Sequence, residues 1–141
     1  MGLDMYVKTS RYQFQRDWNN DDRPHYNGWP QTTTEYEAGY WRKHAPLHNF
    51  IVRNFADDGI DDCSPISLSP EVCRRIAEWL RSKSWSTSEE DNAGFFFGSS
   101  DWWEELKSEA DEDAAVFEKL ADWLEVREDN FWRSAEYQAS W

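Results

Sequence analysis

The sequence predicts an α+β fold, in which an antiparallel or mixed sheet of about five short strands packs against three helices. Strand-like and helix-like segments follow one another in the order β, loop, β, α, β, α, β, α, β. The strand segments are short and half polar, unlike the continuous Val and Ile runs of a parallel sheet. A chain of 141 residues can bury a substantial core, so we expect residues 1–141 to form a single domain.

Two strands are expected in the first third of the chain, with a loop between them. Residues 3–14 alternate in character and are rich in Tyr, Val, Thr and Phe, which is typical of a strand. Residues 17–34 consist largely of turn formers without any period, which predicts a long loop. The second strand, residues 34–41, is expected to carry Tyr36, Ala38 and Tyr40 on one face and Glu35 and Glu37 on the other.

Three helices are expected. The first begins no earlier than about Lys43, because Pro46 is tolerated only in the first turn of a helix. The second begins at Pro70 with Ser69 as its cap. The longest lies near residues 101–128, and its buried stripe is expected to consist of Trp103, Leu106, Ala110, Ala114, Phe117, Ala121 and Leu124.

The remaining strands are expected to be short. Residues 64–69 read as an extended piece, and the sequence GFFFG at residues 94–98 reads as an apolar strand between two glycines. Residues 130–141 are expected to form the last strand of the sheet.

Composition and charge exclude several classes of function. The net charge is −13, and it is concentrated in residues 89–129, which hold 15 acids against three bases. This charge lacks the basic footprint of a nucleic-acid-binding protein, so we expect no nucleic-acid partner. The chain contains neither a secretory signal nor an apolar run of about 18 residues, so we expect a cytoplasmic protein without membrane contact. The Cys and His residues show no zinc spacing, so no metal or cofactor is expected.

A candidate ligand site lies in the sequence AGYWRKHAPLH, residues 38–48. Arg42 and Lys43 are expected at a junction between strand and helix, where the helix N-terminus adds free N–H groups suited to a phosphate. Tyr40 or Trp41 could stack on a base, and His48 could donate to an oxygen. The alternative is purely structural: the two aromatic residues in the core, the two cations paired with nearby acids, and a buried histidine.

A second candidate is the pair Ser99 and Ser100, which precedes the longest helix. Their hydroxyl groups could bind an incoming phosphate, or they could simply cap the helix. We find no catalytic residues, because no nucleophile is accompanied by a base and an orienting group. Phosphodiester cleavage by His48 and Arg42 remains an alternative.

Four motifs in order resemble a known family. They are MGLDMYV at the start, GYWRKHAPLHNF in the first third, GFFFGSSDWWEEL in the last third and YQASW near residue 141. These resemble motifs of small proteins from tailed viruses and prophages, a family without an established function. The resemblance implies a viral protein acting in the cytoplasm of its host.

The function expected from these observations is non-catalytic binding of a phosphorylated small molecule. In a virus, such a protein could evade host defence by sequestering a nucleotide immune signal, with a pocket assembled between subunits of a homo-oligomer. One alternative is an acidic interaction module that inhibits a host protein through the helix near residues 101–128. A second alternative is a nucleotide hydrolase. The same surface, with 5 Lys and 10 Arg, would also fit a salt-loving host without any partner.

Overall fold

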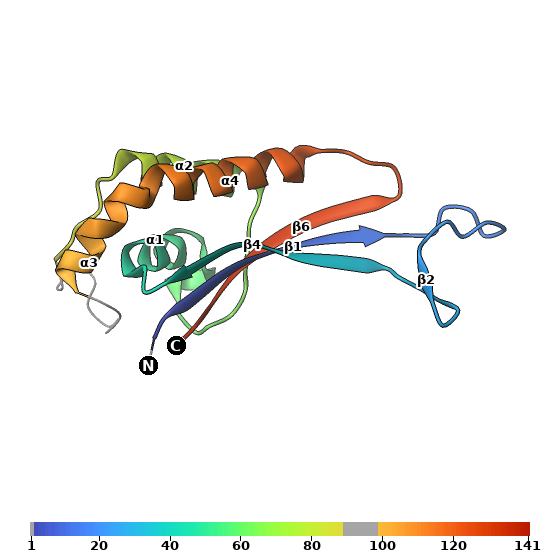
Figure 1. Cartoon of the computed structure of the whole chain (residues 1–141), viewed down its shortest axis with the longest axis horizontal. Helices are drawn as coiled ribbons and strands as arrows, with labels where there is room; N and C mark the ends of the chain where they lie inside the picture. The colour runs from blue at the N-terminus through green and yellow to red at the C-terminus, as the bar shows by residue number, and fades with distance from the viewer. Residues whose placement is uncertain (1, 89–98) are drawn as a thin grey trace.

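The computed structural model describes residues 2–88 and 99–141, and it has the α+β fold expected from the sequence. Three long strands run side by side, with helices covering one face at one end, while the opposite end extends beyond the helices as an arm (Figure 1). We call this extension, which ends in residues 14–32, the distal arm. No helix in the described ranges is long and apolar enough to cross a membrane.

The sheet is antiparallel, with the order β4–β1–β6–β5. Its strands are β1 (Asp4–Gln13), β4 (Thr33–Arg42), β6 (Phe131–Ser140) and the short β5 (Ile66–Ser67). The alternation expected in β1 is present, because its side chains at Met5, Val7 and Thr9 are buried under the helices. The predicted strand at residues 94–98 lies outside the described residues.

A β-bulge at Ala38 changes which side chains of β4 face the helices. Val7 pairs with Gly39 and Lys8 pairs with Glu37, so Ala38 has no partner on β1. Tyr36 therefore lies opposite the buried Thr9, on the helix side, whereas Tyr40 lies opposite Tyr6 on the other face. The expectation that Tyr36, Ala38 and Tyr40 share one face is wrong, because the extra residue shifts the alternation.

The segment expected to be one long loop contains a small hairpin. Strands β2 (His25–Tyr26) and β3 (Trp29–Pro30) pair at the far end of the distal arm (Figure 1). Asn27 and Gly28, which join them, both have positive φ angles, as a tight hairpin turn of this kind requires.

The helices begin where the local signals indicate. Helix α1 (Ala45–Phe55) has Pro46 in its first turn, and α2 (Pro70–Ser82) begins behind the cap Ser69, whose side chain accepts a bond from Val72 N at 3.1 Å. The expected long helix is three consecutive segments, α3 (Ser100–Glu105), a 3₁₀ turn η2 (Leu106–Glu109) and α4 (Ala110–Glu125). A further 3₁₀ turn, η1 (Asp57–Gly59), follows α1.

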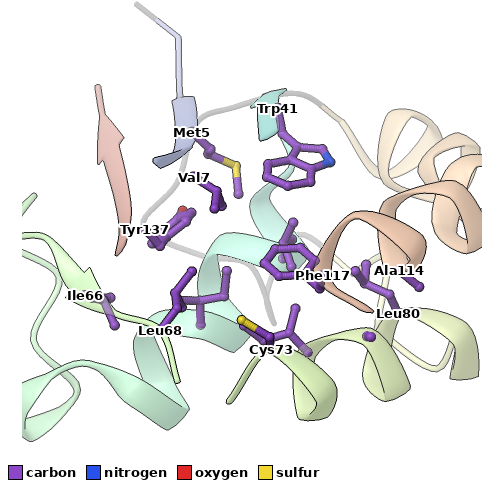
Figure 2. Close-up of a cluster of buried hydrophobic side chains, with 14 of the residues drawn as sticks. Met5, Val7, Trp41, Ile66, Leu68, Cys73, Leu80, Ala114, Phe117 and Tyr137 are labelled. Atoms are coloured by element: carbon purple, nitrogen blue, oxygen red, sulfur yellow. The ribbon is translucent and has the colours of Figure 1, made fainter. Parts of the chain in front are cut away.

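The core lies between the sheet and the helices. Trp41 of β4 and Phe117 of α4 stack at 5.3 Å between ring centroids, beside Met5, Val7 and Tyr137 of the sheet (Figure 2). Six members of the expected stripe are buried, but Leu124 is only partly buried because α4 ends at Glu125. The absence of a side chain at Gly39 makes room for the Trp41 ring, since a Cβ there would lie 2.6 Å from Trp41 Cη2.

Candidate functional site

Arg42 and Lys43 lie at an open concavity together with Ser99 and Trp102. We call it the Arg42–Lys43 concavity, and its volume is about 630 Å³. The site thus combines residues from the end of β4 and from the start of α3, which are far apart in the sequence. It brings together two cations, one hydroxyl group and one indole ring.

The backbone of the strand-to-helix junction fixes the position of these groups. Arg42 is the last residue of β4, and Lys43 turns the chain with a φ angle of 57°. The Lys43 amide donates to Leu3 O at 2.8 Å, and the Lys43 carbonyl accepts from Trp102 Nε1 at 2.9 Å. The indole of Trp102 is therefore tied to the same turn that carries the two cations, which makes the site preformed.

Among residues 2–88 and 99–141, few carboxylates lie close to the two cations. Arg42 lies 3.9 Å from Asp4, measured between Nε and Oδ1, and the Arg42 side chain is 65% exposed. Tyr40 occupies the same Asp4 oxygen through its hydroxyl group at 2.6 Å, and this hydrogen bond raises the pKa of Tyr40. Lys43 forms no ion pair with any residue of the described ranges. A guanidinium and an ammonium group are therefore available to an anion here.

The other expected site residues lie elsewhere. Trp41 is buried against Phe117, and Tyr40 lies on the helix-free face of the sheet, 5.2 Å from the Tyr6 ring. Ser100 is the first residue of α3 and does not line the concavity. Ser99 does line it, although its hydroxyl group also caps α3 by accepting from Trp102 N at 3.4 Å.

The first turn of α1 is not exposed to the concavity. Its residues Ala45, Pro46 and Leu47 are buried, and the Leu47 amide donates to His44 Nδ1 at 3.2 Å. The first turn of α1 is therefore buried inside the protein and does not assist Arg42 and Lys43 at the concavity.

His48 belongs to a separate buried cluster. Its Nδ1 lies 2.5 Å from the Tyr137 hydroxyl group and its Nε2 lies 2.9 Å from Asp61 Oδ2. Burial lowers the pKa of His48, while the hydrogen bond to Asp61 acts in the opposite direction. The side chain is 1% exposed, so it cannot reach a substrate held by Arg42. The geometry gives no support to phosphodiester cleavage by these two residues.

The acidic side chains of α4 are partly neutralised by arginines of α2. Arg74 of α2 pairs with Asp122 and Glu125 of α4, and Arg81 pairs with Glu118. Part of the local excess of acids is therefore matched within the protein, which leaves less of it for a basic partner.

Sequence reasoning did not single out Trp102. The helical stripe correctly marked Trp103 as buried, and that signal also implies that the adjacent Trp102 points to another side. Which surface it would meet depends on the packing of α3 beside the Lys43 turn, and the local sequence carries no sign of this.

Comparisons of the chain with protein-family models, with curated proteins and with solved structures find no match.

Proposed function

We propose that the protein binds a phosphorylated small molecule at the Arg42–Lys43 concavity and releases it unchanged. The observation that carries the proposal is that two cations and one aromatic ring meet at a single concave site, where the described part of the chain brings only the Asp4 carboxylate within ion-pair distance. The protein as a whole has a net charge of −13, so it repels anions at long range. The affinity must therefore come from close contacts between the ligand and the residues of the concavity.

Each residue has a distinct role in this proposal. Arg42 offers its planar donor fork to phosphoryl oxygens, and Lys43 adds a second positive charge. Ser99 contributes a hydroxyl group, and the half-buried Trp102 ring offers an apolar face to a nucleobase. The resemblance to viral proteins adds the setting of a host cytoplasm, where the ligand would be a nucleotide immune signal. A homo-oligomer follows from the proposal that the pocket is assembled between subunits, and not from the resemblance.

The test is calorimetry with inorganic phosphate and with mono-, di- and cyclic nucleotides on the wild type and on Arg42→Glu. Losing a charge-assisted contact costs about 1.5–3 kcal/mol, so Arg42→Glu should weaken binding by at least about tenfold. Arg16→Glu is the matched control, because Arg16 is also an exposed arginine near one carboxylate, Asp129, but lies on the distal arm. The control should bind like the wild type.

The same samples distinguish the alternatives. Ligand recovered intact after release supports sequestration, whereas cleaved ligand supports the hydrolase. A folded protein that binds nothing in the panel would overturn the proposal and leave the acidic interaction module as the better hypothesis. Native mass spectrometry of protein taken directly from cells reports the subunit number and any retained ligand together.

A further inference from the structure

A second cleft, separate from the Arg42–Lys43 concavity, lies between β4 and α4. Its volume is about 390 Å³, within the range of small-molecule sites. The two clefts have no lining residue in common. We call it the bulge cleft, because it includes the unpaired residue Ala38 of β4. Its main lining residues are Tyr36, Ala38, Val116, Lys119, Leu120 and Trp123.

Different local features of β4 and α4 bring their side chains to the bulge cleft. On β4, the bulge turns Tyr36 toward the helices, although the side chain remains 59% exposed. On α4, Val116, Leu120 and Trp123 recur at spacings of four and three, so they share one face of the helix. Apolar side chains therefore form one wall, and an aromatic ring stands on the opposite wall.

Tyr36 and Trp123 are both held by contacts with neighbouring strands. The Arg133 guanidinium group lies 4.8 Å from the Trp123 ring centroid, and its Nη1 donates to Trp123 O at 2.9 Å. Thr9 Oγ1 donates to Tyr36 O at 3.4 Å. Within the described part of the chain, no ring contact joins Tyr36 to Trp123. The two rings thus line one cleft without stacking on each other.

The charge at the bulge cleft favours an acidic ligand. Lys119 is exposed at its edge and forms no ion pair with any residue of ranges 2–88 and 99–141. The carboxylate that also lines the cleft, Glu37, lies opposite Lys8 in the β1–β4 register and can be balanced there. One ammonium group beside an apolar aromatic cleft is complementary to a ring that carries one negative charge.

We propose that the bulge cleft binds an aromatic acid, with the ring between Tyr36 and Trp123 and the acid group at Lys119. Rings stacked on aromatic side chains gain from both area and geometry, and a charged group held at the rim adds orientation. This site is independent of the proposed phosphate site, so either proposal can be wrong without affecting the other.

The experiment uses a pair of fluorescent probes that differ mainly in charge: anilinonaphthalene sulfonate, an aromatic acid, and N-phenylnaphthylamine, its neutral counterpart. Both are titrated into the wild type, Tyr36→Ala and Lys119→Gln. We expect one saturable site for the sulfonate. Tyr36→Ala should weaken both probes by about tenfold or more, whereas Lys119→Gln should weaken only the sulfonate, by about threefold to tenfold.

Two control variants test whether other exposed tyrosine or lysine residues bind the probes. Tyr26→Ala removes a tyrosine that is 76% exposed on the distal arm, and Lys83→Gln removes an exposed lysine that follows α2 and does not line the bulge cleft. Neither should change the affinity for either probe. Circular dichroism before each titration confirms that the variants are folded, which is expected because all four positions are exposed.

Several results would overturn the proposal. They are the absence of saturable binding, a loss of binding with Tyr26→Ala instead of Tyr36→Ala, and an equal response of both probes to Lys119→Gln. Size-exclusion chromatography with light scattering can provide one more result that would overturn the proposal. A dimer that Tyr36→Ala dissociates would show that a second copy of the chain occupies the bulge cleft.

Discussion

At the scale of single residues, His44 is buried as a neutral imidazole, which low pH disfavours. It caps α1 through Nδ1, and its Nε2 is buried without a hydrogen-bond partner in the described part of the chain. Burial lowers the pKa of His44 to about 3. The folded state thus requires the neutral imidazole, whereas the unfolded chain binds a proton near pH 6.5.

The sign of the resulting pH dependence follows from this difference. Between about pH 6.5 and pH 3 the unfolded state binds more protons at His44, so the free energy of unfolding falls as the pH falls. The slope from this group approaches about 1.4 kcal/mol per pH unit. His44→Asn keeps a good helix cap without a titrating group, so urea unfolding at pH 7 and pH 5 should show a flatter dependence. An unchanged slope would show that the pKa of His44 is the same in the folded and unfolded states.

The candidate site shows how far sequence reasoning reaches at this scale. Arg42 and Lys43 were expected at the end of a strand, and they line an open concavity. Trp41 and His48 were assigned to the same site because they are close in sequence. Trp41, however, points to the opposite side of the strand from Arg42, and His48 lies on the buried face of α1. Only the tertiary structure could place Trp102 there instead.

At the scale of elements, the contact between β4 and α4 depends on Gly39. An added Cβ would lie 2.6 Å from Cη2 and 2.8 Å from Cζ3 of Trp41, whose ring is held by Phe117. We expect Gly39→Ala to destabilise the protein by about 1–3 kcal/mol in urea unfolding, as overpacked cores do. The effect should shrink in a Trp41→Leu background, because the clashing ring is gone. Equal effects in both backgrounds would contradict this cause.

The packing of α4 itself is tested at Phe117, which is completely buried. Phe117→Ala removes a large ring from the core and should lower the free energy of unfolding by about 3–5 kcal/mol. Val126→Ala is the control, because Val126 is 48% exposed just beyond α4 and should change stability by less than about 0.5 kcal/mol. A loss below about 1 kcal/mol for Phe117→Ala would mean that the core tolerates the cavity by rearranging.

Elements with strong local signals were predicted well. The start of α2 at Pro70 and the long final strand are both present as expected. The β2–β3 hairpin was missed, although Asn27 and Gly28 form the kind of pair that favours a tight turn. Its strands are only two residues long, so the alternation that identifies a strand could not appear. The bulge at Ala38 was missed as well, although a glycine inside a strand, here the adjacent Gly39, often marks a bulge.

At the scale of the whole molecule, net charge should control how stability responds to salt. The protein carries −13, and its ion pairs between α2 and α4 involve exposed side chains that contribute little. Added salt screens the repulsion, so we expect the melting temperature to rise by several degrees between about 0.01 M and 1 M NaCl.

A double variant provides the control for this prediction. Arg74→Gln with Arg81→Gln makes the protein more negative, so its melting temperature should be lower in dilute buffer and should rise more steeply with salt. A melting temperature that falls with added salt would show that the ion pairs outweigh the general repulsion. In that case the double variant should lose the salt response.

The position of β1 between β4 and β6 also determines when the sheet can be completed during synthesis. β1 and β4 are near in sequence and can pair early, but Gln13 pairs with Phe131, so the other edge of β1 waits for the last strand. Until β6 leaves the ribosome, a nascent chain carries an open strand edge and an uncovered apolar face, both of which promote aggregation. We therefore expect this protein to aggregate more readily during synthesis than a protein whose neighbouring strands are adjacent in sequence.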